Sequence, residues 1–142
     1  MGDLKLTYQV DGGDLVQAGE ASSQMKMTLK KLGLPPEIIR KASVCMYEGE
    51  INMVIHADGG RVEVEVGMDA ITIRLIDQGP GIPDVDRAME EGYSTAGDVA
   101  RDLGFGAGMG LPNMKRNSDE MRIDTTVGVG TTVTMRIDIN NG

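Results

Sequence analysis

Alternation of apolar and polar residues is the feature that most constrains the fold of this chain. In residues 4–10 and 62–66 every second residue is apolar, which is the pattern of a half-buried strand. A sheet of such strands has one packed face and one polar face, and this is typical of antiparallel sheets. The predicted strands cover residues 4–10, 62–66, 71–77, 121–126 and 131–139.

Helical segments lie between these strands. Residues 16–32 predict a helix that ends at Gly33. Pro36 suits the first turn of a longer helix that reaches about Ala57, and residues 58–60 (Asp-Gly-Gly) stop it. Shorter helical pieces are predicted at residues 84–91 and 111–119. This order predicts a two-layer α/β sandwich with a mixed, mostly antiparallel sheet and helices on one face, in a single domain over residues 1–142.

The core of this fold has to be built almost without aromatic residues. The chain of 142 residues contains one Phe, no Trp and 11 Met. Because Met side chains fill irregular spaces well, we expect Met to supply the core together with Ile, Val and Leu.

Net charge and the single cysteine narrow the class of function. The formal net charge is −8, whereas sequence-independent binding to nucleic acid or to anionic lipid needs a surplus of Lys and Arg. Cys45 has no partner for an intramolecular disulfide, and no apolar run approaches the length of a membrane span. The sequence therefore predicts a cytoplasmic protein that binds neither nucleic acid nor membrane, with Cys45 as a packed residue.

A first candidate motif lies on the second helix. Glu48 and Asn52 are four residues apart, so they share one face of the helix. Gly49 lies between them, and a glycine inside a helix costs about 1 kcal/mol relative to Ala, which suggests that a ligand or another backbone approaches closely there. The alternative is a solvated polar stripe, because this spacing is common by chance.

Two glycine-containing segments complete the set. Asp77 ends an apolar strand and is followed by Gly79 and Gly81, so its carboxylate can accept a hydrogen bond from a ligand's amino group. A plain turn would use the same residues. Residues 104–110 carry four alternating glycines directly before a helix, where backbone N–H groups can converge on phosphate. They match neither a P-loop nor the dinucleotide fingerprint, and a flexible linker is the alternative.

The order of these three motifs resembles the N, G1 and G2 boxes of the GHKL ATPase superfamily. Residues 128–133 also resemble the last motif of that superfamily, in which a Thr helps to hold adenine. The resemblance covers nearly the whole chain and implies the Bergerat ATP-binding fold, with ATP held between the helices and a lid over residues 83–105 that is mobile without nucleotide.

The resemblance also implies a role for each matching position. Glu48 would be the general base, Asn52 would ligate Mg²⁺, and Asp77 would bind the adenine amino group. Thr131 or Thr132 would lie near the adenine. Arg101, in the lid, is either a contact of the γ-phosphate or a solvated residue. The other residues implied to contact nucleotide are Gly79, Gly81, Ile82, Gly106, Gly108, Met109, Gly110 and Leu111.

Residues 91–95 and 108–120 narrow the resemblance to the small bacterial anti-sigma-type serine/threonine kinases, above all the switch kinases of stress-signalling complexes. Such a kinase phosphorylates Ser or Thr of a STAS-domain partner in a sigma-factor pathway. Two alternatives remain: stoichiometric capture of a sigma factor or other partner, and a nucleotide sensor without phosphotransfer. His56 is the only histidine, and we expect it to be a packed helix residue and not a phosphoacceptor. The family also allows a homodimer through the open face of the sheet.

Overall fold

The computed structural model describes residues 4–11, 19–56, 59–79 and 110–139 of the chain. The helical piece predicted at residues 84–91, the lid predicted at residues 83–105 and Arg101 lie outside the described residues. So does the beginning of the first predicted helix, at residues 16–18.

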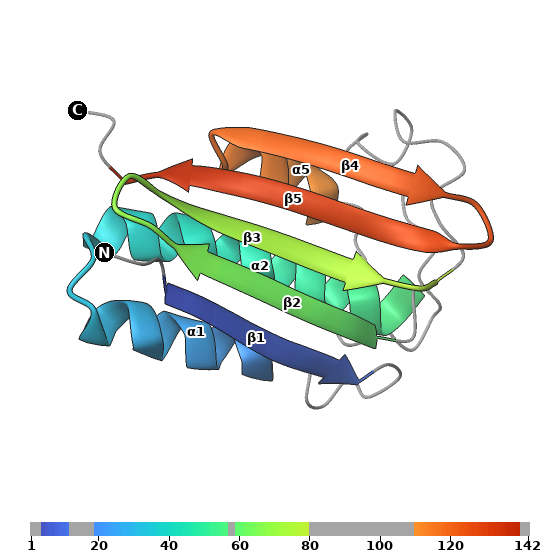
Figure 1. The fold of residues 1–142 in the computed structure, drawn as a ribbon, viewed down its shortest axis with the longest axis horizontal. Coiled ribbons are helices and arrows are strands. Elements are labelled where there is room, and N and C mark those ends of the chain that lie inside the picture. The colour runs from blue at the N-terminus through green and yellow to red at the C-terminus, as the bar shows by residue number, and fades with distance from the viewer. Residues whose placement is uncertain (1–3, 12–18, 57–58, 80–109, 140–142) are drawn as a thin grey trace.

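A five-stranded sheet forms one layer of the molecule. The strands follow the spatial order β1-β2-β3-β5-β4, and each of the four pairings is antiparallel (Figure 1). The strands are β1 (Leu4–Asp11), β2 (Gly59–Val66), β3 (Ala70–Asp77), β4 (Glu120–Thr126) and β5 (Gly130–Asp138). The predicted antiparallel sheet is confirmed, and the described strands contain no parallel pair.

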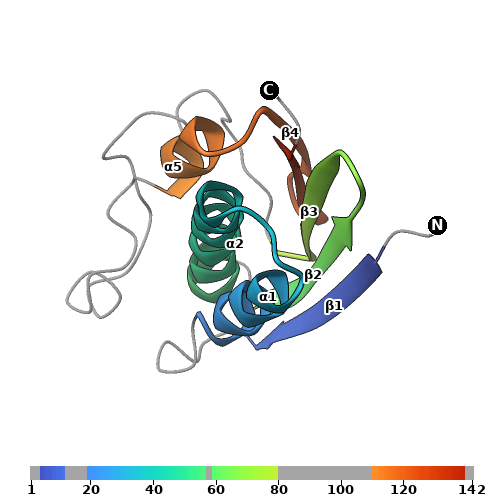
Figure 2. The same ribbon diagram turned by 90° about the vertical axis from the view of Figure 1, so that its left-hand side faces the viewer.

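In the described part of the chain, three helices form the second layer and lie on one face of the sheet. They are α1 (Glu20–Lys31), α2 (Pro36–His56) and α5 (Gly110–Arg116). Figure 2 shows α2 between α1 and α5, with the sheet on one side of all three. The predicted two-layer α/β sandwich is therefore confirmed. Because α2 contacts both other helices and the sheet, it is the element around which the fold is organised.

The predicted alternation decides which face of each strand is buried. Along β3, Ile71, Ile73 and Leu75 are buried beneath the helices, and the residues between them are partly exposed. The core also contains buried methionines on every helix and on β5, as the composition predicted: Met25, Met46, Met53, Met114 and Met135.

Glycines at residues 59 and 60 behave differently from the prediction. They follow the end of α2 at His56, as expected of residues that stop the helix, but both already belong to β2, which was predicted to begin at residue 62, and they pair with the end of β1. Gly60 has a φ of 154°, and a Cβ there would lie 2.3 Å from the carbonyl oxygen of Ile76 and 2.6 Å from Cε of Met53. The strand therefore begins earlier than predicted, and the close approach of β3 requires a glycine at residue 60.

Candidate nucleotide-binding site

The predicted general base lies on α2, on the side that faces α5. The side chain of Glu48 is half-buried, and its Oε1 accepts a hydrogen bond from Nδ2 of Asn113 at 3.2 Å. Burial raises the pKa of Glu48 above its ordinary value of 4.5, and the hydrogen bond from Asn113 partly opposes that rise. Among the described residues, Oε2 of Glu48 accepts no hydrogen bond. This carboxylate is therefore fixed at one oxygen and left with a free acceptor at the other.

Asn52 lies one helical turn beyond Glu48 and is partly exposed. Its amide forms no hydrogen bond with the described part of the chain, so the amide oxygen of Asn52 is available to bind a ligand. The neighbouring Met53 is buried against β2 and β3 at Gly60, which places this turn of the helix over the end of β3.

Gly49 has a different role from the one predicted. A Cβ at this position would lie 2.4 Å from Cδ2 and 2.6 Å from Cδ1 of Leu75. No ligand or backbone atom is needed to explain the glycine, because a side chain of β3 fills the space. The contact brings Glu48 and its neighbours onto the strand that ends in Asp77, two residues beyond Leu75.

Asp77 is held in a fixed orientation at the end of β3. Its Oδ1 accepts backbone N–H hydrogen bonds from Gly79 at 2.9 Å and from Thr131 at 3.2 Å. Thr131 is the residue of β5 that pairs with Asp77, and its hydroxyl hydrogen-bonds with that of Thr125 on β4 at 2.9 Å. A Cβ at Gly130 would lie 2.2 Å from the carbonyl oxygen of Asp77, so this corner is too tight for any other residue.

The structure separates the two candidate threonines. Thr131 is buried and continues the row of β5 residues that face the helices. Thr132 pairs with Ile76, the residue before Asp77, and points to the opposite face of the sheet. Thr131 therefore shares a face with Asp77, and Thr132 does not.

The glycine-rich segment is described only at its end. Gly110 begins α5, and Leu111 is buried against the core. Gly79 is described through its hydrogen bond to Asp77. The remaining predicted nucleotide contacts lie outside the described residues: Gly81, Ile82, Gly106, Gly108 and Met109.

One carboxylate of this region was not singled out by the sequence. Glu50 is only 3 % exposed, and it accepts backbone N–H hydrogen bonds from Gly19, Ala21 and Ser22 at 2.9, 3.3 and 3.0 Å. The hydroxyl of Ser22 donates a fourth at 2.6 Å. Glu50 thus caps the N-terminus of α1, where Gly19 has no side chain to do so. Residues 28–31 positions apart meet here, which no local pattern reveals.

Comparison with known proteins bears on the same residues. Residues 44–141 match the family described as histidine kinase-, DNA gyrase B- and HSP90-like ATPases. The chain belongs to this ATPase family. The match begins just before Glu48 and includes Asn52, Asp77 and Thr131.

Individual relatives are named as a serine/threonine-protein kinase and as anti-sigma F factors. The chain is 33 % identical over 108 residues to the serine/threonine-protein kinase RsbT of Bacillus subtilis, covering 73 % of this chain and 75 % of the relative. It is 31 % identical over 129 residues to the anti-sigma F factor of Clostridium beijerinckii, covering 85 % and 87 %. These similarities confirm the predicted resemblance to the anti-sigma-type kinases.

A solved structure supports the fold. The mycobacterial sensor histidine kinase MprB superposes with a TM-score of 0.54 at 16 % identity, over 95 % of this chain and 97 % of that chain. Within the described residues, no helix is both long and apolar enough to cross a membrane.

Proposed function

We propose that this protein is an ATP-dependent protein serine/threonine kinase, whose acceptor is a Ser or Thr of a STAS-domain partner in a sigma-factor pathway. The observation that carries the proposal is the half-buried carboxylate of Glu48, which is held at Oε1 by Asn113 and accepts no hydrogen bond at Oε2 from the described residues. The identity to a protein named as a serine/threonine kinase supports the reaction class.

Glu48 has the properties of a general base for this reaction. Its free Oε2 can accept the proton of an incoming hydroxyl, while Oε1 stays bound to Asn113. Burial raises the pKa of Glu48, and a carboxylate of higher pKa takes up a proton more readily. Glu48 is thus more basic than an exposed glutamate.

The corner around Asp77 fits an adenine base. Oδ1 of Asp77 is occupied by two backbone N–H groups, so its orientation is set and Oδ2 is left to accept from an amino group. Thr131 lies on the same face and lines the same corner. Bound Mg-ATP would supply the phosphoryl group and the charge of the metal. Asn52 would offer one amide oxygen to that cation, which prefers oxygen ligands and keeps several waters.

A direct test is transfer of labelled γ-phosphate from Mg-ATP to a STAS-domain protein of the same source. Wild type is compared with Glu48→Gln, which keeps the shape of the base, and with Asp77→Asn, which keeps the shape of the adenine contact. Transfer by wild type that is lost in both variants is expected. Nucleotide binding without transfer to any STAS-domain protein would refute the kinase proposal while leaving the pocket intact.

A second function is favoured by one observation, namely the similarity to proteins named anti-sigma F factors. In this case the chain would capture a sigma factor stoichiometrically, with nucleotide controlling the affinity. Stable binding of a sigma factor by the Glu48→Gln variant would support this function, because capture does not require the base.

A further inference from the structure

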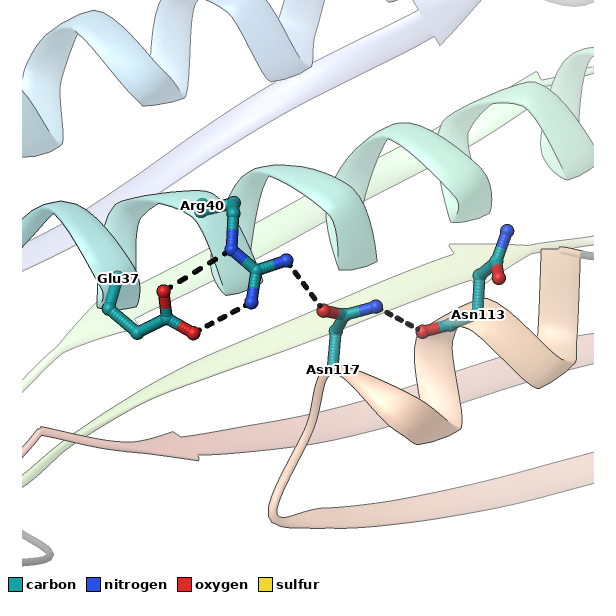
Figure 3. A network of polar contacts seen from close by, with 4 residues as sticks. All are labelled: Glu37, Arg40, Asn113 and Asn117. Carbon is teal, nitrogen blue, oxygen red and sulfur yellow. Dashed lines mark hydrogen bonds and ion pairs between the residues drawn. The ribbon is translucent and has the colours of Figure 1, made fainter.

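The contact between α2 and α5 has a buried apolar part and an exposed polar part. In the buried part, Met114 of α5 packs in the core and its carbonyl oxygen accepts a hydrogen bond from the thiol of Cys45 on α2 at 3.6 Å. The polar part is a chain along the outer edge of the two helices, in which the side chains of Glu37, Arg40 and Asn117 lead to the backbone carbonyl of Asn113 (Figure 3). It begins near the first turn of α2 and ends beside Glu48.

Asn113 is the member of this chain that contacts Glu48. Its Nδ2 donates to Oε1 of Glu48, and its Oδ1 accepts from Nη1 of Arg116, each at 3.2 Å. Since a guanidinium can only donate, Arg116 fixes the oxygen of the amide on its own side. The amino group must then face Glu48. The orientation of the amide is thereby determined by the charge of its two neighbours.

Asn117 ties the backbone of α5 to α2 at the same place. Its Nδ2 donates to the carbonyl oxygen of Asn113 at 2.8 Å, and its Oδ1 accepts from Nη1 of Arg40 at 3.3 Å. Arg40 is in turn held by the carboxylate of Glu37 at 2.7 Å. Glu37 and Arg40 are exposed, so their bonds are weak, but together with Asn117 they hold Asn113 in one place relative to α2.

We propose that Asn113 is a positioning residue for Glu48: it binds Oε1, and so presents Oε2 to the acceptor hydroxyl, while Arg40 and Asn117 keep Asn113 within reach. This inference rests on the kinase function proposed above. It adds a residue that the nucleotide-binding motifs do not account for, and it assigns a purpose to the polar chain in Figure 3.

The surroundings of Glu48 make the role of Asn113 measurable. Beneath α2, the strands direct apolar side chains such as Leu75 toward the helix. The ionisable groups of α2 next to Glu48 are Tyr47 and Glu50, and Glu50 is engaged by the N-terminus of α1. From α5, Arg116 donates to Oδ1 of Asn113, the residue that contacts Glu48. Among the described residues, the donor of Asn113 is therefore the group that opposes the effect of burial on the pKa of Glu48.

The test is a titration of the Glu48 carboxyl by carbon-13 NMR in the full, nucleotide-free chain. The signal is assigned by its absence in Glu48→Gln. Removing the donor with Asn113→Leu is expected to move the titration of Glu48 to higher pH, because burial is then unopposed. Asn113→Ala removes the same donor without adding apolar bulk, so a folding defect of the leucine variant does not prevent the measurement. Lys115→Met changes an exposed neighbour on α5 and is expected to leave the titration unchanged.

Kinetics provide a second readout. With the STAS-domain acceptor, Asn113→Leu is expected to lower kcat about tenfold and to leave the KM for ATP unchanged, since misplacing a reacting group affects the chemical step. The proposal is overturned if the Glu48 carboxyl has the same titration midpoint in wild type and in both Asn113 variants. The NMR result does not depend on kinase activity. If the kinase proposal alone is wrong, wild type will transfer no phosphate although the titration of Glu48 still shifts in the Asn113 variants.

Discussion

Two carboxylates of α2, only two positions apart, have opposite surroundings. Glu50 is buried and accepts four hydrogen bonds from the first turn of α1. Glu48 is half-buried and accepts one, from Asn113 of α5. A buried carboxylate with all its acceptor positions used holds the fold together, whereas one that is desolvated but incompletely bonded is suited to react.

Helical geometry explains how neighbours can differ so much. Two positions along an α-helix turn the side chain through about 200°, so Glu48 and Glu50 point to opposite sides of α2. Figure 2 shows α5 on one side and α1 on the other. We call the side of α2 that carries Glu50 and faces α1 the structural side, and the side that carries Glu48 and faces α5 the chemical side. Substitutions on the two sides should have different consequences.

The largest effect is expected on the structural side. Glu50→Ala removes the acceptor for three backbone N–H groups and the hydroxyl of Ser22, and leaves these donors unsatisfied. We expect the free energy of unfolding to fall by about 3 kcal/mol. Urea denaturation, monitored by circular dichroism, measures this free energy. A change below about 1 kcal/mol would show that α1 does not depend on this cap.

On the chemical side, Glu48→Gln should abolish activity without harming the fold. Loss of a general base lowers the rate by about a hundredfold or more. Burial raises the pKa of Glu48 above 4.5, so the folded state holds this proton more tightly than the unfolded chain does. Ionisation of Glu48 therefore costs stability as the pH rises from 4.5 through the folded pKa. Gln avoids that cost.

The matching measurement is the Tm of Glu48→Gln and wild type from pH 4 to pH 8. The variant should be at least as stable as wild type at neutral pH, and the difference should shrink toward pH 4. If the Tm of Glu48→Gln at pH 7 is well below that of wild type, Glu48 stabilises the fold as Glu50 does, and the difference proposed between the two carboxylates is wrong.

A smaller effect is expected at Gly49, which separates them. An added Cβ would collide with Leu75, although Ala also gains helix propensity, so Gly49→Ala should destabilise by about 1 kcal/mol net. Combining it with Leu75→Ala should cost less than the sum of the two single changes. Strict additivity in urea denaturation would indicate that the helix moves away from the sheet instead of meeting Leu75.

The smallest effect is expected for alkylation of Cys45 in the native protein. Burial raises the pKa of Cys45 to about 12, and its Sγ lies beneath α5. At pH 8 the thiolate fraction is negligible, so iodoacetamide should not label the native protein within minutes, although it should label the urea-unfolded chain. Mass spectrometry measures the labelling. Rapid labelling of the native protein would mean that α5 moves away from α2 readily and exposes Cys45.

Much of the fold was predictable because it depends on local patterns. Alternation in residues 71–77 determined the buried face of β3, and Gly33, with a φ of 77°, ends α1 as its sequence suggested. The start of β2 was predicted three residues too late, since the requirement for glycine at residue 60 comes from Ile76 on the adjacent strand. The sequence does not record that contact at any fixed spacing.

The candidate site shows the same division. Glu48, Asn52 and Asp77 could be selected because their order along the chain matches known motifs, and the structure brings their elements together. Glu50 and Asn113 could not be selected, because what distinguishes them is a partner on another helix. The functions assigned to the selected residues remain predictions.

The pairing of β3 with β5 also has a consequence for how the protein folds. The hairpins β2–β3 and β4–β5 are each closed by short turns, but joining them pairs Asp77 with Thr131 across more than 50 intervening residues. Closing so long a loop is entropically unfavourable and slows folding, so we expect the hairpins to form before they join. The corner that would receive adenine is therefore absent from early intermediates, and nucleotide can act only on chains that have completed this last step.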